Sequence, residues 1–174
     1  MNEIVSRYFT TYFQTILIKL ILTLFIIFFE LSLSQIDFFY YKSPLIFFTF
    51  IFFWIVEIGL LPFWTYFLIC LAFDLICMNH LGLFTFPMIC IIFLLNFINL
   101  EQINSSYLRK LIIFASLLLL LQTIQVLIFF MLYFTFPSLE TMALQYIFTI
   151  MFYPIIVFFL SPIKNLINLI SAQL

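Results

Sequence analysis

The stretch Trp64-Thr-Tyr-Phe-Leu-Ile-Cys-Leu-Ala-Phe-Asp74-Leu-Ile-Cys-Met-Asn-His-Leu-Gly82-Leu-Phe-Thr-Phe86 decides how this chain folds. It is an apolar run with one carboxylate, Asp74, followed by the short turn Met78–Gly82 and then by further apolar sequence. A charge between two apolar segments of membrane character is costly and is usually kept for a structural or functional reason. The turn also needs a flexible residue, and Gly82 is one of only two glycines in the chain.

Composition sets the class of protein. Hydrophobic residues make up 67% of the chain and charged residues 7%, whereas soluble domains carry roughly 25% charged residues. We therefore predict an all-α integral membrane protein, and 174 residues leave room for about six transmembrane helices. The net charge is −1 and no basic tract is present, which excludes a typical nucleic-acid-binding protein. Cys70, Cys77 and Cys90 lie in apolar runs without metal-ligand spacing, so we interpret them as small buried hydrophobes.

Breaks in the apolar pattern divide a single transmembrane domain, residues 1–174, into spans. Ser34–Ser43 is a polar loop, and Pro44 suits the start of a helix because its missing N–H costs nothing there. The apolar run Leu45–Cys77 is too long for one span, and we divide it at Gly59 and Pro62. The predicted spans are about 16–33, 45–58, 63–77, 83–98, 108–134 and 141–160.

Two of these spans, 45–58 and 63–77, are shorter than the about 20 residues that usually cross a bilayer, so they need flanking helices or a locally thinned bilayer. Residues 1–15 are predicted to form a short interfacial helix, and residues 162–174 an amphipathic tail on the membrane surface.

The basic residues predict the orientation. With six spans and a cytoplasmic N-terminus, only Lys42 lies outside. The cytoplasmic side then carries Arg7, Lys19, Arg109, Lys110 and Lys164. The positive-inside rule therefore favours six spans with both termini in the cytoplasm.

Polar residues inside the spans are the candidates for chemistry. The chain has one histidine, His80, and no metal-protease or phosphate-loop motif, so we expect no enzymatic activity, no metal and no cofactor. Asp74 could accept hydrogen bonds from N–H groups at the start of the next span, or it could bind a ligand or proton, and we favour the first role. Glu57 could bind a substrate cation or reach out to the inner interface, and we favour the second role. Glu30 is expected close to the far interface.

Glutamines supply the remaining polar groups. Gln122 and Gln125 share one helix face because they are spaced i, i+3. Together with Gln145 they are interpreted as interhelical hydrogen bonders, worth about 0.5–2 kcal/mol each. Gln122 and Gln125 are also candidates for contact with a partner protein.

The order of these features resembles one known family. Asp74-Leu75 followed by Leu81-Gly82 and an apolar helix resembles the signature of the rod shape-determining protein MreD family. The resemblance covers nearly the whole chain. It includes, in the same order, Pro44 before an apolar helix with Trp54, then Pro62, and then Pro154 before a tail with Lys164. The chain departs from the family at Met78-Asn79, where a glycine is usual, and at Thr85, where a small residue is frequent.

The resemblance implies a non-enzymatic subunit of the bacterial cell-shape (rod, elongasome) complex in the inner membrane. Such a subunit supports peptidoglycan synthesis and cell wall biogenesis through contact with membrane partners. The implied partners are an MreC-like single-pass membrane protein and, indirectly, the actin-like MreB and the peptidoglycan synthase pair. The family is also thought to be similar in fold to the substrate-binding subunits of energy-coupling-factor transporters. The alternative is therefore a small six-span solute- or vitamin-binding transporter subunit, with Asp74, Asn79, His80, Gln122 or Gln125 at its pocket.

Overall fold

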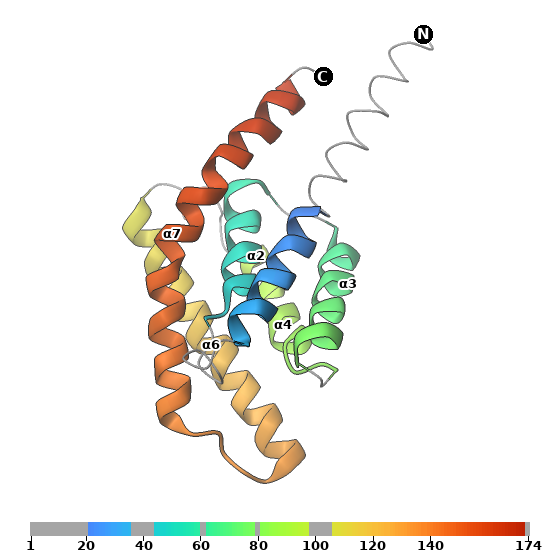
Figure 1. The fold of residues 1–174 in the computed structure, drawn as a ribbon, viewed down its shortest axis with the longest axis vertical. Helices are drawn as coiled ribbons and strands as arrows, with labels where there is room; N and C mark the ends of the chain where they lie inside the picture. Colours follow the sequence, from blue (N-terminus) through green and yellow to red (C-terminus); the bar gives the residue numbers. More distant parts are fainter. Residues whose placement is uncertain (1–20, 36–43, 60–61, 79–80, 98–105, 173–174) are drawn as a thin grey trace.

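The computed structural model describes residues 21–35, 44–59, 62–78, 81–97 and 106–172, of which 78 and 166–172 are described by their backbone alone. All regular structure in these ranges is helical (Figure 1), so the predicted all-α fold is confirmed. The predicted interfacial helix 1–15 and most of the predicted loop 34–43 lie outside the described residues. The helices are Ile21–Ser34, α2 (Ile46–Glu57), α3 (Phe63–Phe73), the π-helical turn η1 (Asp74–Met78), α4 (Thr85–Phe97), α6 (Tyr107–Tyr133) and α7 (Leu139–Ala172).

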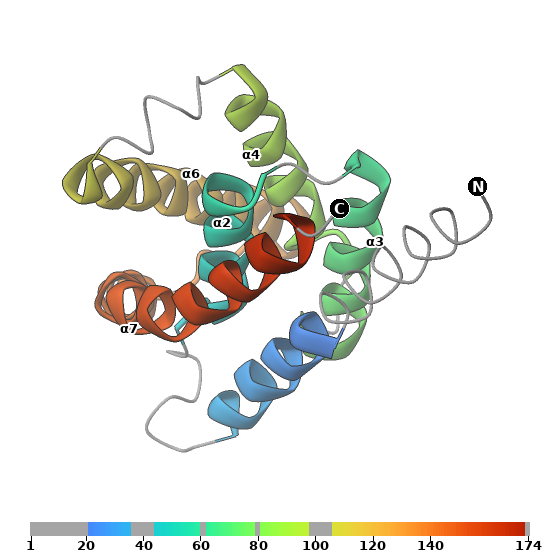
Figure 2. The ribbon, with the colours of Figure 1, turned by 90° about the horizontal axis from the view of Figure 1, so that it is seen from above.

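Helix α2 is the centre of the bundle. Figure 2 shows it surrounded by the other helices, and every side chain from Ile46 to Val56 is buried. Its residues are apolar on all sides, as expected for a helix with neighbours all round. The Phe47 ring stacks on Phe73 of α3 with centroids 4.3 Å apart, and Phe48 packs on Phe114 of α6. The short second span is therefore flanked by other helices, one of the two solutions that its length predicted.

The break between α2 and α3 lies where the sequence places it. Helix α2 ends at Glu57, Gly59 takes a φ of +111°, and Pro62 is the residue immediately before α3. A positive φ of this kind is accessible to glycine without steric cost, so Gly59 allows the chain to reverse between two consecutive helices. The boundaries of α4 and α6 also agree with the predicted spans to within a few residues.

The C-terminal boundary is wrong in the prediction, because α7 continues through Pro154 and Pro162 to Ala172. There is no separate tail starting at residue 162. A proline removes one N–H and frees the carbonyl four residues earlier, but a hydroxyl can take that place. Here the carbonyl of Phe158 accepts a hydrogen bond from Ser161 Oγ at 3.1 Å. The helix therefore tolerates Pro162.

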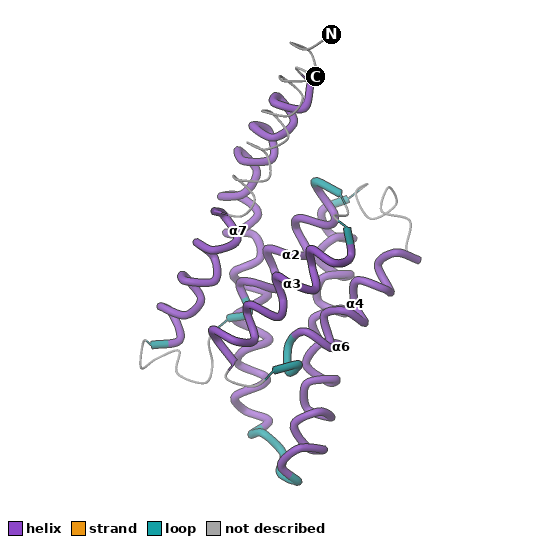
Figure 3. The backbone as a smooth tube through the Cα atoms, turned by 90° about the vertical axis from the view of Figure 1, so that its right-hand side faces the viewer, coloured by secondary structure: helices purple, strands orange, loops and turns teal. Residues whose placement is uncertain are grey.

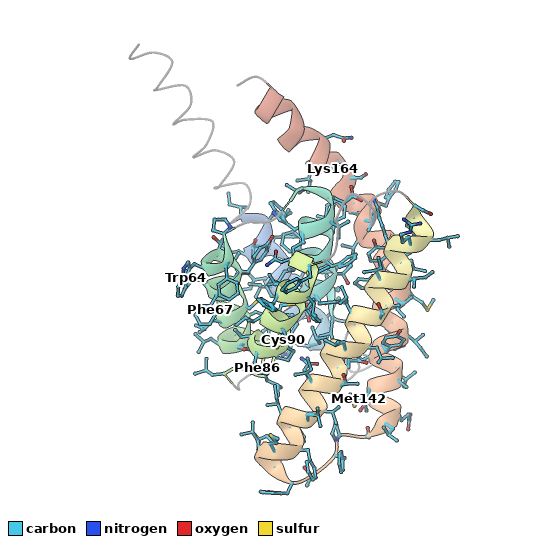
Figure 4. All side chains as sticks on the ribbon, turned by 180° about the vertical axis from the view of Figure 1, so that it is seen from behind. Trp64, Phe67, Phe86, Cys90, Met142 and Lys164 are labelled. Atoms are coloured by element: carbon cyan, nitrogen blue, oxygen red, sulfur yellow. The ribbon has the colours of Figure 1, made fainter. Side chains whose placement is uncertain are left out.

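Apolar side chains cover the outside of the bundle. Trp64 is 72% exposed, and it and Phe67 project away from α3 in Figure 4. The buried polar residues lie inside and are Thr23, Glu30, Thr49, Asp74, Thr85, Gln122 and Thr149. Helix α6 and the section Leu139–Asn165 of α7 are long and apolar enough to cross a membrane. The other apolar helices in the described ranges are shorter.

Candidate functional site

The Asp74 carboxylate joins the end of α3 to the start of α4. It is fully buried, and its Oδ1 accepts the N–H of Phe84 at 2.9 Å. Its Oδ2 accepts the N–H groups of Gly82 at 2.9 Å and Thr85 at 3.0 Å, and also the Thr85 hydroxyl. The first N–H groups of a helix have no partner within the helix, and they carry the positive end of its dipole. Asp74 thus does what the turn-closing interpretation predicts.

The signature residues around Asp74 divide into two groups. Gly82 lies in the turn at a φ of +92° with open space around it, so its backbone conformation, not its small size, suits glycine. Leu75 and Leu81 are 58% and 67% exposed, so their side chains lie at the surface. Asn79 and His80 lie outside the described residues. Of the predicted pocket residues in this stretch, the structure therefore assigns a place only to Asp74.

A second carboxylate, Glu30, has a similar role that the sequence did not predict. We expected it near the interface, but it is buried, and its Oε2 accepts the N–H of Phe47 at 2.6 Å. The N–H of Leu45, two residues before Phe47, donates to Thr149 Oγ1 of α7 at 3.0 Å. Pro44 precedes this point and is buried. Helix α2 has no side-chain cap of its own, so residues from two other helices supply it.

Glu57 lies at the other end of α2, between two lysines. Its carboxylate oxygens pair with Lys110 of α6 and with Lys164 of α7. The Glu57 side chain is only 12% exposed. Glu57 therefore does not need a substrate cation, and its position at the inner interface stays a prediction. The cations belong to the chain itself and join three helices.

The glutamines of α6 differ in their surroundings. Gln122 is buried, and its Nε2 donates to the Met142 carbonyl of α7 at 3.4 Å. Gln125 is half-buried. Gln145 of α7 accepts the Thr149 hydroxyl at its carbonyl oxygen. Gln122 is therefore an interhelical hydrogen bonder within the chain, and its contact with a partner stays a prediction.

A groove runs between α6 and α7 on the part of the hairpin near its turn. It encloses about 840 Å³ and is open at its side. In Figure 4, Met142 lies near this end of α7, and Lys164 lies toward the opposite end. The groove is lined by Leu119, Gln122, Thr123, Val126, Leu127, Phe136, Pro137, Leu139, Met142, Ala143 and Tyr146. Its lining is mainly apolar, so it suits an apolar occupant.

The two remaining signature prolines lie away from both carboxylates. Pro62 is exposed at the start of α3, and Pro154 is exposed inside α7. Within the described part of the chain, no group of three His, Cys, Asp or Glu side chains is placed to hold a metal ion. No protein-family model, curated protein or solved structure matches this chain.

Proposed function

We propose that this chain is a multi-pass protein of the bacterial cytoplasmic membrane that acts without enzymatic chemistry, by holding a single-pass partner in the cell-shape complex. The observation that carries the proposal is the open apolar groove between α6 and α7. The carboxylates of Asp74, Glu30 and Glu57, in contrast, are bound by groups of the chain's own helices and turns. The resemblance of Asp74-Leu75 and Leu81-Gly82 to the MreD signature supports the same function.

The distribution of polarity supports a membrane location. Large apolar side chains are exposed on every described helix except the central α2, and seven polar residues are buried inside. Exposed apolar surface of this extent is typical of contact with lipid or with another protein. Lys110 and Lys164 lie together at one end of α6 and α7. We assign that end to the cytoplasmic side, in keeping with the positive-inside rule, with both termini also cytoplasmic.

The groove supports an occupant of helical shape. Within a bilayer, helices gain little from burying apolar surface, so association depends on close packing and on shape. Two antiparallel helices with a groove between them offer such a seat. Leu127, Phe136 and Leu139 along it are more than half exposed. We infer that it receives the transmembrane helix of an MreC-like single-pass protein, which links the chain indirectly to MreB and the peptidoglycan synthase pair.

The test is co-purification with that partner from detergent-solubilised membranes. Ala143→Phe fills the groove and should lower partner recovery at least about tenfold, the equivalent of about 1.4 kcal/mol. Met151→Phe is the matched control, because Met151 is an exposed apolar residue of the same helix outside the groove lining. Substitution of Gln122 is less informative, since it breaks a bond within the chain.

Cell shape gives the second measurement. Rod-shaped cells lacking the protein should become round, and Ala143→Phe should reproduce the defect while Met151→Phe should not. Normal rod growth after deletion, together with tight vitamin binding by the purified protein, would favour the solute-binding transporter subunit instead. Equal recovery of the partner with both phenylalanine variants would contradict the groove as its seat.

A further inference from the structure

The helices of this bundle reach to different depths. Helix α2 has 12 residues and is therefore about 18 Å long. Helix α6 has 27 residues and is therefore about 40 Å long. Figures 1 and 3 show the α6–α7 hairpin projecting well beyond the ends of the shorter helices.

Contacts fix how these lengths align. At the cytoplasmic end, Glu57 of α2 pairs with Lys110 and Lys164. At the other end of α2, the N–H of Leu45 donates to Thr149. Helix α2 therefore lies beside the section 149–164 of α7. The section 139–148 continues beyond it for about 15 Å.

The ends of the other short helices lie near the same level. The Phe47 ring contacts the rings of Phe73 and Phe84, which places the Asp74 turn beside the start of α2. Glu30 bonds to Phe47, which places the end of the Ile21–Ser34 helix there too. The segments that join these helices in the sequence carry Asp37, Lys42 and His80, which lie outside the described residues.

A bilayer of uniform thickness does not match both the long α6–α7 hairpin and the shorter helices beside it. The section 110–133 of α6 is about 35 Å long, which matches a hydrocarbon core of about 30 Å for a tilted helix. With Lys110 at one interface, the polar turns of the short helices would then lie inside the hydrocarbon of the far leaflet. Turn backbone and charged connections are not stable against lipid chains.

We propose that the far leaflet is locally thinned over the Ile21–Ser34 helix, α2, α3 and α4, so that head groups and water reach the Asp74 turn. The α6–α7 hairpin keeps a bilayer of full thickness at its side and forms the step between the two regions. This inference rests on the proposed membrane location. Thinning a bilayer around short helices costs little free energy. Placing charged loops in hydrocarbon costs much more.

The test compares two cysteines in the full chain, with Cys70, Cys77 and Cys90 changed to alanine. Leu81→Cys reports on the turn, where Leu81 is exposed. Ile147→Cys is the control, because Ile147 is half exposed on α7 and lies beyond the level of Leu45, toward the hairpin turn. Each protein is placed in nanodiscs of dioleoyl phosphatidylcholine, which leave both faces open. It is then treated with a charged, membrane-impermeant maleimide.

We expect Leu81→Cys to react at least about ten times faster than Ile147→Cys. If both react slowly, the turn lies in hydrocarbon and the thinned leaflet is excluded, while the membrane location stands. If both react fast, the hairpin has no lipid around it, and both the thinning and the membrane location fail. Gln35→Cys, at the exposed end of the Ile21–Ser34 helix, is a second reporter if Leu81→Cys does not fold, and unchanged melting temperatures confirm folding.

Discussion

At the scale of single residues, the buried carboxylate of Asp74 accepts several hydrogen bonds at once. Its two oxygens receive three backbone N–H groups and one hydroxyl from the start of α4. An asparagine has one acceptor oxygen, and its NH₂ group would face donors. A leucine would leave all of these donors without a partner. Each buried donor that loses its partner costs about 1–3 kcal/mol.

We therefore expect Asp74→Asn to destabilise the protein by about 1–3 kcal/mol, and Asp74→Leu by more. Thr85→Val, which removes only the hydroxyl donor, should have the smallest effect of the three. Thermal unfolding of the purified variants in detergent measures this order of stability. If the asparagine and leucine variants fold equally well but both lose function in cells, the charge itself is needed, and the ligand- or proton-binding interpretation replaces the structural one.

At the scale of elements, α2 depends on its neighbours for its first turn. Its free N–H groups at Leu45 and Phe47 are received by Thr149 and Glu30, from two different helices. These bonds couple the start of the central helix to the outer ones. Loss of either acceptor should loosen the packing of α2 as well as its first turn.

Thr149→Val tests this coupling with little change of shape. It removes the acceptor for Leu45, and we expect a loss of about 1–3 kcal/mol of unfolding free energy. Thr123→Val is the matched control, because the Thr123 hydroxyl is exposed and bonds only within α6. Its effect should stay within about 0.5 kcal/mol. Equal effects of the two substitutions in thermal unfolding would show that the Leu45 bond contributes little.

The same helices show which features can be predicted from one sequence. Gly59 and Pro62 act on the backbone next to them, so the break between α2 and α3 is predictable. Asp74 and its acceptor role are predictable too, because its partners follow within 11 residues. The bond from Leu45 to Thr149 spans 104 residues, and no local pattern announces it. Pro162 led to the wrong prediction that the helix ends there. The Ser161 hydroxyl bonds to the Phe158 carbonyl that the proline leaves free, and only the three-dimensional structure shows this bond.

At the scale of the whole molecule, Glu57 joins the central helix to the long hairpin. Lys110 comes from the start of α6, and Lys164 comes from the far part of α7. The Lys164 side chain is 30% exposed and can turn toward water or lipid head groups, whereas Glu57 is enclosed. Removing the two cations should therefore be worse than removing the carboxylate.

We expect the double variant Lys110→Met/Lys164→Met to be the least stable, because it leaves an enclosed carboxylate without a cation. The cost should lie below the about 3–5 kcal/mol that is typical of breaking a fully buried pair from one side, because this cluster is partly buried. Lys164→Met alone should cost much less, since Lys110 keeps its bond to Glu57. The triple variant, which adds Glu57→Leu, should regain stability over the double variant, because it removes the uncompensated charge and replaces the cluster with apolar side chains. Thermal unfolding in detergent compares the three proteins. A triple variant no more stable than the double would mean that the carboxylate reaches solvent when its lysines are gone, and that the cluster does not enclose it.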